Sequence, residues 1–565
     1  MQQQIFGCVE GAQTLYLATH ATIGKPVIYL SRDDLELKQL SQGLSLFAPD
    51  IDVVCLPAWD CLPYDRLSPH GDITGERIST LSKLASTEIL NTKNLILLTI
   101  NSFLQKIPPK SFFLNASLKL SKGADYNLNE IASFLQDCGF NRTNTVREYG
   151  EFAIRGDIVD IFSDPSTHPF RLDFFGAELE KIRFFDSSSQ LGLTEVDHLI
   201  LNPVAEYRLS DEYITRFRKN YISLFGASAA RDQLYEEITA GITPVGIEHW
   251  MSLFHPELVT ITDWLPDASV IIPHDFSVYS EKRSALIEEF YQSRLSAIGQ
   301  DSFNYRPVPP EQMYVSQNEI HKLFNRKKPT ILSPFSAPEK TTQNYEALSL
   351  DGKTGPVFSA TQENRFSPSK SAAKMIEDTL TNRSIILVGS SKGAILKLTE
   401  LVSPHLSHPI TPLEPGTKLV AGQIYSAVWS IANGFMFPDI WILTEQDVFG
   451  SRQNRPAGRR KRSDEFLREV SALQTDDLVV HIEHGIGRYN GLETVQSGGG
   501  EHDCLRLIYA GGDRLFIPVE NIDLLSYYGH DRPMVTCNLI TEHIKFCPAS
   551  FYLTHFCGKF QSNKC

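Results

Sequence analysis

The sequence predicts a multidomain α/β protein with an inserted β-rich module and a small β-barrel near its C-terminus. Three observations predict this: short apolar runs alternate with helical patterns over residues 1–125, two-residue periodicity begins near residue 126, and short strands separated by glycine turns fill residues 476–529. A chain of 565 residues suits several domains, because one domain commonly holds roughly 100–200 residues.

Composition predicts an ordinary core-forming protein, with 42% hydrophobic and 21% charged residues. A net charge of −14 argues against a chain that is basic throughout and binds nucleic acid with its whole surface. No apolar run approaches the roughly 18–20 residues that cross a bilayer, and the N-terminus lacks the pattern of a secretory signal. These features predict a cytoplasmic protein with no membrane partner.

The nine cysteines contain no C-x-x-C pair, so we expect no bound metal. Four of them gather near the C-terminus, namely Cys537, Cys547, Cys557 and Cys565. The others are scattered, which is typical of buried thiols.

Residues 1–125 predict the first part of a wound α/β domain. Apolar runs at 25–31, 52–58 and 94–100 are buried strands, and helical patterns at 32–47 and 74–86 lie between them. Buried strands that alternate with helices indicate a parallel sheet.

Residues 126–203 predict the β-rich module. An amphipathic helix at 127–140 precedes alternating strands at 148–156, 157–163, 170–176 and 178–186, which are typical of an antiparallel meander. Residues 204–335 then return to the first domain as a mainly helical segment with one strand at 268–275.

Four further segments complete the predicted order. They are a small α/β domain at 336–450, a basic linker with a short helix at 451–475, a β-barrel at 476–529 and an atypical tail at 530–565.

Three stretches have some features of a phosphate-binding loop, but none fits the motif. Gly352-Lys353-Thr354 has alanine where the first glycine belongs, and Gly355-Pro356 follows it. The stretch 388–394 lies between a strand and a helix but lacks a hydroxyl after its lysine, so a plain glycine–serine turn is favoured. The turn at 10–21 has no lysine. We therefore expect no catalysis and no cofactor in this chain.

Other polar groups also favour structural roles. Glu445 and Asp447 end a buried strand, where they are expected to cap it. His481 and His484 have no third metal ligand nearby, which favours histidines of a barrel or turn.

Two blocks of sequence resemble one family. The first runs from "LPAWDCLPYDRLSPHGDITGERISTLSKL" (56–84) to "REYGEFAIRGDIVDIF" and "PFRLDFFGAELEKIRFFD" (169–186); the second is "DLVVHIEHGIGRYNGLETV" with "LRLIYAGGDRLFIPVENIDLLSYY" (477–528). In this order they resemble the N-terminal half of the bacterial transcription-repair coupling factors (Mfd), over roughly residues 1–529.

The resemblance implies a role for each region. The first α/β unit would be a degenerate helicase-like domain similar to UvrB without its ATPase motifs, the inserted module would capture UvrA, and a barrel of the SH3/Tudor type, similar to CarD, would dock on the RNA polymerase β subunit. The chain would be an adaptor in transcription-coupled DNA repair. ATP and magnesium belong to the family's motor lobes, which no residues here resemble.

The tail departs from the family, and we expect a truncated or frame-shifted product, with an unusual genuine tail as the alternative. Two other functions stay open: an ATP-dependent UvrB-like helicase or excision-repair subunit, and a CarD-like transcription regulator.

The resemblance assigns UvrA binding to Arg155, Arg171 and Phe175. Strand alternation places Arg171, Asp173 and Phe175 on one face, with Leu172 and Phe174 directed into the core. The alternative from the residues alone is that the two arginines form solvated ion pairs with Asp157 and Asp173.

The resemblance also assigns polymerase binding to the barrel, at Val495 with Arg488 and Leu492 nearby; ordinary core packing of Val495 is the alternative. The basic run Arg459, Arg460, Lys461 and Arg462 is a candidate for weak contact with duplex DNA, although such runs are more often solvated linkers.

Overall fold

A computed structural model describes most of the chain as two compact units, residues 1–451 and 452–565. The described residues are 2–21, 25–85, 93–115, 117–164, 167–298, 305–338, 345–358, 368–450, 477–481, 485–497, 500–509, 514–518 and 525–529. In this part of the chain no helix is both long and apolar enough to span a membrane.

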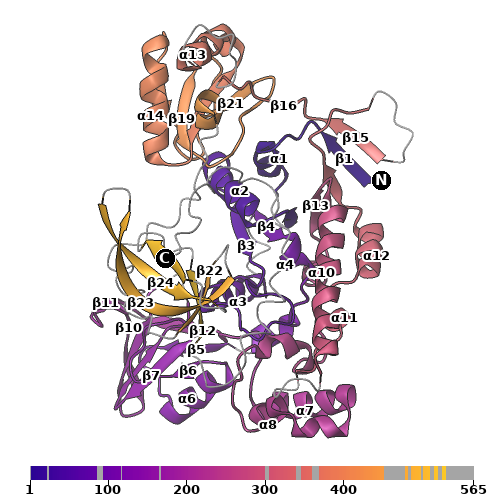
Figure 1. Cartoon of the computed structure of the whole chain (residues 1–565), viewed down its shortest axis with the longest axis vertical. Coiled ribbons are helices and arrows are strands. Elements are labelled where there is room, and N and C mark those ends of the chain that lie inside the picture. Colours follow the sequence, from indigo (N-terminus) through magenta and orange to yellow (C-terminus); the bar gives the residue numbers. More distant parts are fainter. Residues whose placement is uncertain are drawn as a thin grey trace, which may run out of the picture. The chain divides into compact units, whose positions relative to one another are not determined.

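A parallel seven-stranded sheet organises the first domain, as predicted (Figure 1). Its strand order is β15-β1-β14-β13-β2-β4-β3. The strands are β1 (Gln2–Phe6), β2 (Val27–Ser31), β3 (Asp52–Leu56), β4 (Asn94–Thr99), β13 (Ser269–Pro273), β14 (Thr330–Leu332) and β15 (Tyr345–Ser349). β15 lies beyond the expected domain boundary at 336, yet it pairs with β1 along its whole length.

Helices of the first domain follow the apolar periodicity of the sequence. They are α1 (Ala12–His20), α2 (Asp34–Phe47), α3 (Gly71–Ala85), α4 (Ile100–Leu104) and α5 (Lys110–Asn115). Asp33 caps α2 by accepting a hydrogen bond from the Glu36 backbone N–H, which is a common start signal for a helix.

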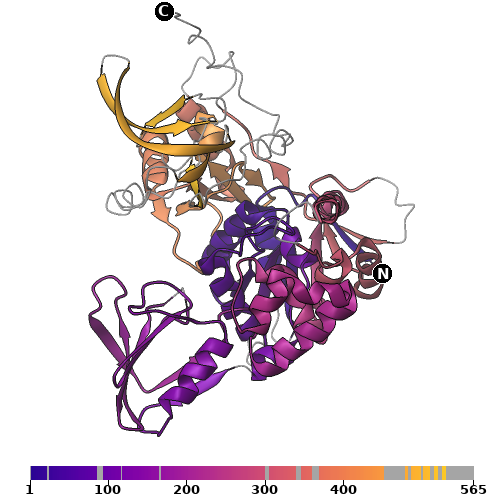
Figure 2. The same cartoon turned by 60° about the horizontal axis from the view of Figure 1, so that its bottom comes forward.

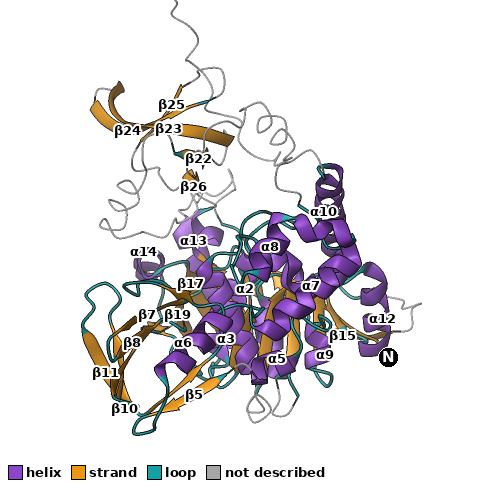
Figure 3. Ribbon diagram, turned by 90° about the horizontal axis from the view of Figure 1, so that it is seen from below, coloured by secondary structure: helices purple, strands orange, loops and turns teal. Residues whose placement is uncertain are grey.

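The returning segment is mainly helical, as Figure 3 shows for α7, α8 and α10. It packs around an aromatic core that also includes Trp59 and Tyr64 from the first part of the domain. Its helices are α7 (Asp211–Phe225), η2 (Ala227–Arg231), α8 (Gln233–Thr239), η3 (Ile247–Leu253), α9 (Ile261–Trp264), α10 (Phe276–Ser296), α11 (Pro310–Met313) and α12 (Gln317–Lys327). The predicted strand in this segment is β13, which joins the first sheet.

A buried ion pair anchors this return to the first domain. Arg77 on α3 donates to both carboxylate oxygens of Glu206, at 2.7 and 3.1 Å, and Trp59 donates to the same carboxylate. Both charged side chains are almost fully buried. The pair fixes the position of α3 relative to the returning segment, because an unpaired charge at this buried site would strongly destabilise the fold.

The β-rich module comprises a six-stranded sheet in the order β11-β10-β9-β8-β7-β6 and a two-stranded sheet, β12-β5. Its elements are β5 (Leu118–Ser121), α6 (Leu128–Asp137), β6 (Asn141–Arg142), β7 (Glu151–Arg155), β8 (Ile158–Ile161), β9 (Phe170–Phe175), β10 (Glu178–Phe185), β11 (Gly192–Val196) and β12 (His198–Leu201). Figure 2 shows α6 beside this sheet, where Ile131 and Leu135 join its apolar core. The predicted antiparallel meander is confirmed for β7 to β11.

Residues 353–449 contain a further sheet, in the order β16-β20-β21-β17-β19-β18. Its strands include both parallel and antiparallel pairs. Its elements are β16 (Lys353–Thr354), α13 (Pro368–Thr379), η4 (Leu380–Asn382), β17 (Ser384–Gly389), α14 (Lys392–Val402), η5 (Ser403–His405), β18 (Ile410–Pro412), β19 (Ile424–Val428), β20 (Phe435–Met436), β21 (Ile440–Thr444) and α15 (Glu445–Phe449). This is the strand–turn–helix pattern that the sequence predicts around residues 383–402.

The second unit contains a five-stranded antiparallel sheet in the order β25-β24-β23-β22-β26. The strands are β22 (Leu478–His481), β23 (Gly485–Ser497), β24 (Gly500–Ile508), β25 (Arg514–Pro518) and β26 (Leu525–Gly529). The antiparallel strands agree with the β-rich pattern predicted for 476–529, although β23 is a long strand of 13 residues. The predicted helix in 451–475 and the tail at 530–565 lie outside the described residues.

Candidate functional site on the inserted β-sheet

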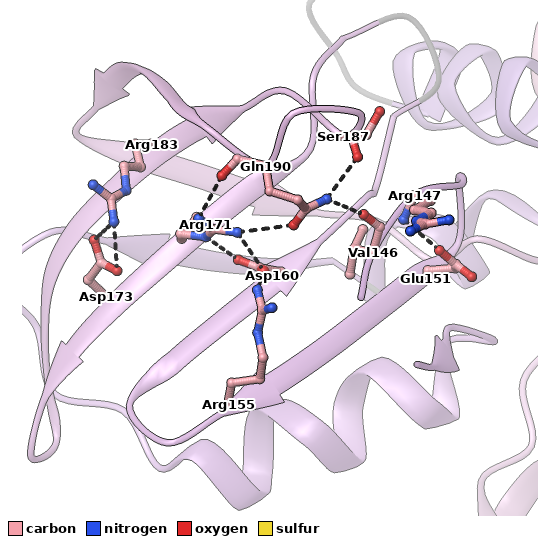
Figure 4. Close-up of polar contacts among 10 residues, drawn as sticks. All are labelled: Val146, Arg147, Glu151, Arg155, Asp160, Arg171, Asp173, Arg183, Ser187 and Gln190. Carbon is pink, nitrogen blue, oxygen red and sulfur yellow. Dashed lines mark hydrogen bonds and ion pairs between the residues drawn. The ribbon is translucent and has the colours of Figure 1, made fainter. Parts of the chain in front are cut away.

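Asp160 is the centre of a polar cluster on the β-rich module (Figure 4). Its side chain is fully buried in β8, where strand register sets it opposite Arg171 of β9 and Ala153 of β7. Arg171 donates from Nε to Oδ1 at 2.6 Å and from Nη2 to Oδ2 at 2.9 Å, and Arg155 donates to the same Oδ2. A buried carboxylate is tolerated only when it is paired in this way.

The Arg171 guanidinium contacts Asp160, Phe185 and Gln190. Only 13% of its side chain is exposed, and its guanidinium lies 4.5 Å from the centre of the Phe185 ring. Gln190 accepts from Arg171 at its backbone oxygen, 3.1 Å away, and at its side-chain oxygen, 3.4 Å away. The hydrogen bond to Asp160 raises the pKa of Arg171, so the guanidinium stays charged.

Gln190 closes a short loop over Arg171. Its amide donates to the backbone oxygens of Val146 and Ser187 at 3.0 and 2.8 Å. Asp186 begins this loop and accepts from the backbone N–H groups of Ser188 and Ser189. Gln190 has a φ of 60°, which is unusual for a residue other than glycine. The hydrogen bonds of its side chain and backbone hold this strained conformation.

Arg155 and Phe175 are the exposed members of the predicted set. The Arg155 side chain is 46% exposed and Phe175 is 75% exposed. Both lie at the same end of the sheet, because the Phe174 N–H bonds to the Asp157 oxygen of the turn that follows Arg155. The burial pattern of β9 confirms the predicted alternation, with Leu172 and Phe174 buried.

The predicted ion-pair partners of the arginines need correction. Neither Asp157 nor Asp173 pairs with Arg155 or Arg171 in the described part of the chain: Asp160 pairs with both, and Asp173 pairs with Arg183 at 2.9 Å. The reason is register, since Asp160 lies directly across from Arg171, whereas Asp173 faces Lys181 and lies diagonal to Arg183. Arg171 is therefore mostly shielded from solvent and paired with Asp160, instead of forming a solvated ion pair.

Asp160, Phe185 and Gln190 were missed by the sequence reasoning. One signal for Asp160 was present, because a single aspartate interrupts the apolar run "IVDIF". Its partner Arg171 could not be read from the sequence, because that pairing depends on cross-strand register. Gln190 gave no such signal, because its role depends on the path of a loop.

The candidate residues for polymerase binding all lie on β23 of the five-stranded sheet. Arg488 is half-buried and stands opposite Leu478 of β22 and Ile508 of β24. Leu492 and Val495 pair with Leu505 and His502 of β24. Among the described residues, β22 pairs only with positions 485–488 of β23, so the strand has an open edge at Val495. The run Arg459–Arg462 lies outside the described residues.

The stretch at 388–394, which follows a strand as a phosphate-binding loop would, is bonded to the carboxylate of Glu445. Glu445 Oε1 accepts from the Ser390 backbone N–H at 3.2 Å and from its hydroxyl at 2.6 Å. Lys353 and Thr354 form a short strand and do not open a helix. Asp447 accepts from the N–H groups of Thr444 and Gly434, which confirms its predicted capping role.

Comparison with protein families identifies two classes of domain. Residues 118–207 match the UvrB interaction domain, and residues 473–529 match the CarD-like/TRCF RID domain. The cluster around Asp160 therefore lies in a domain of the UvrB interaction class, and β22 to β26 lie in a domain of the CarD-like class.

The similar full-length proteins are transcription-repair-coupling factors. The one from Haemophilus influenzae is 30% identical over 513 residues, which cover 89% of this chain and 43% of that protein. Those from Rickettsia bellii and Escherichia coli are 28% and 27% identical, over 44% and 45% of their lengths. This chain thus resembles the N-terminal half of transcription-repair coupling factors and spans less than half the length of these relatives.

Proposed function

We propose that this chain is an adaptor that recruits UvrA through its β-rich module and docks on RNA polymerase through the sheet of its second unit. The observation that carries the proposal is the pairing of two matched domains in one chain, a UvrB interaction domain and a CarD-like/TRCF RID domain. The similarity to transcription-repair coupling factors over 89% of the chain supports the same role.

The UvrA-binding surface would consist of Phe175 and the exposed part of Arg155, with Arg171 as a positioning residue behind them. An aromatic ring that is 75% exposed beside an arginine has the composition of an interface hot spot. Asp160 accepts a hydrogen bond from Nη2 of Arg155 and so orients this side chain. The other donors of the Arg155 guanidinium could then bind an acidic group of the partner.

The test is a titration of UvrA with the full chain. Phe175→Ala should weaken binding by at least about tenfold, because a hot-spot truncation costs roughly 2 kcal/mol or more. Leu193→Ala is a matched control, since Leu193 is also an exposed apolar residue of the same sheet. Equal affinity of both variants and the unaltered chain would refute this surface.

Polymerase docking would use the open edge of β23 at Val495, with Leu492 and Arg488 nearby. A strand edge can pair with a strand of the partner through its backbone groups. Val495→Arg should abolish co-purification with RNA polymerase, while Thr494→Arg, one position earlier in the same strand, is the control. Retention of polymerase by Val495→Arg would refute the assignment to this edge.

We also propose that this chain does not hydrolyse ATP and needs no cofactor. Glu445 holds the donor groups that a phosphate would need at 388–394, and no tested stretch has the residues of a phosphate-binding loop. An ATPase assay separates this adaptor from a UvrB-like helicase, because only the latter would turn over ATP. Weak contact of Arg459–Arg462 with duplex DNA is a further proposal, tested by neutralising the run in a filter-binding assay.

A further inference from the structure

The first domain contains a cavity of about 410 Å³ that belongs to neither proposed interface. It lies where β2, β13 and β14 end, and it is bordered by the segments that lead into α1, α2 and α10. All strands of this sheet are parallel, so their carboxyl ends meet at one edge, which is where open α/β sheets usually bind small molecules.

The lining is rich in hydrogen-bond acceptors and poor in free cations. It contains four carboxyl groups, those of Glu10, Asp33, Glu36 and Asp275, and one guanidinium, that of Arg32. Arg32 is already engaged: its Nε donates to both oxygens of Asp275, at 3.1 and 2.9 Å, and its Nη1 lies 3.4 Å from Glu36.

The Glu36 carboxyl is held in place by donors of the protein. It accepts from the Tyr29 hydroxyl at 2.9 Å and from the Arg32 backbone N–H at 2.8 Å. Even so, burial raises the pKa of Glu36 above its usual value, which means that these donors do not fully offset the lost hydration. A further positive charge in the cavity would stabilise the carboxylate.

An independent feature, the Gln13 side chain, indicates a ligand. Only 6% of this residue is exposed, and it lines the cavity. Its side chain makes no hydrogen bond to any described residue. Next to it, the hydroxyl of fully buried Thr14 also lacks a partner among these residues and borders a small adjoining recess. Buried polar groups are normally satisfied, so donors or acceptors of a bound molecule are expected here.

The remaining walls are apolar and suit methylene groups. They are formed by Pro273, Leu332, Pro334 and Leu35, the last of which is 64% exposed at the rim. Phosphate is disfavoured because the carboxylates would repel it and Arg32 is committed to them. A metal ion is not indicated, since no cluster of three His, Cys, Asp or Glu ligands exists in the described part of the chain.

We propose that this cavity binds a small aliphatic diamine, with one ammonium group between Glu10 and Glu36 and the other at Gln13. The two carboxylates accept hydrogen bonds from the first ammonium, the prolines and Leu332 contact the methylene chain, and the side-chain oxygen of Gln13 accepts a hydrogen bond from the second ammonium. The inference stands independently of UvrA and polymerase binding.

The experiment is isothermal titration of the full chain with 1,4-diaminobutane at about 150 mM salt, where long-range surface attraction is screened. We expect saturable binding at one site and none for 1,4-butanediol, which has the same length without the charge. ATP should not bind. Titration with Nα-acetyl-lysine methylamide distinguishes a lysine side chain of a partner from a free amine, and tighter binding of this probe would overturn the proposal.

Variants locate the site. Glu10→Gln, at an exposed position on the rim, and Gln13→Leu should each weaken diamine binding about tenfold, because each variant loses one hydrogen bond to a charged group. Glu400→Gln, an exposed glutamate of α14 outside the cavity, should bind as the unaltered chain does. Thermal unfolding without ligand checks that each variant folds. Equal weakening in all three variants, or no saturable binding to the unaltered chain, would refute the site.

Discussion

At the scale of single residues, the two arginines bound to Asp160 have different roles because their burial differs. Arg171→Ala would leave a fully buried carboxylate with one partner, and removing one member of a buried pair commonly costs about 3–5 kcal/mol. Arg155→Ala should cost about 1 kcal/mol or less, because this side chain is half exposed.

Hydrogen exchange followed by mass spectrometry of the full chain measures this difference locally. Peptides of β8 and β9 should exchange much faster in Arg171→Ala and nearly normally in Arg155→Ala. Loss of UvrA binding in Arg171→Ala would then be a consequence of local unfolding. Normal exchange in Arg171→Ala would contradict the structural role given to this residue.

A second prediction at this scale concerns Glu248, which accepts a hydrogen bond from Ser68 at 2.8 Å. Burial raises its pKa to about 7, and burial lowers the pKa of His249 and His255 to about 4. A carboxyl whose pKa is raised on folding favours the folded state at low pH and loses that contribution as pH rises through its folded pKa. The neutral histidines act in the opposite direction, but only below their unfolded pKa of about 6.5.

Stability should therefore fall by less than about 1 kcal/mol between pH 6.5 and 8 because of Glu248 alone. The full value for such a pKa shift is about 3 kcal/mol, and most of it is lost below pH 6.5, where the Glu248 carboxyl is ionised in the unfolded chain but still protonated in the folded one. Glu248→Gln should remove this slope in urea unfolding curves recorded across that range. An equally steep decline in Glu248→Gln would assign the slope to another group.

At the scale of elements, the loop 186–191 is strained so that Gln190 can reach Arg171. Gln190→Ala removes the side-chain bonds and keeps the positive φ, whereas Gln190→Gly removes the same bonds and relieves the strain. The glycine variant should therefore be more stable than the alanine variant by about 1 kcal/mol. Melting temperatures of the two variants measure the difference, and a less stable glycine variant would show that backbone entropy outweighs the strain.

The sequence allowed most elements to be predicted, but not the partners of their polar side chains. Strands β2, β3 and β4 and helices α2 and α6 follow apolar periodicity, which is local information. The partnership of Asp160 with Arg171 depends on cross-strand register, and the cover formed by Gln190 depends on a loop path, so both are non-local. The addition of β15 to the first sheet was missed for the same reason, since its partner β1 lies at the other end of the domain.

At the scale of the whole molecule, the two proposed interfaces lie in separate compact units, so they should be lost independently. Phe175→Ala should lose UvrA and keep polymerase, and Val495→Arg should keep UvrA and lose polymerase. Substitutions without shared contacts generally have additive effects, so neither should change the affinity for the other partner by more than about twofold.

Size-exclusion chromatography with light scattering tests this with the full chain, UvrA and RNA polymerase. A complex of all three components should form only with the unaltered chain, and each variant should give the corresponding two-component complex. Because an adaptor acts by joining its partners, the double variant should behave like a mixture of free components. Joint elution of UvrA and polymerase with either single variant would mean that a further surface connects them, and the two-site description of the chain would then be wrong.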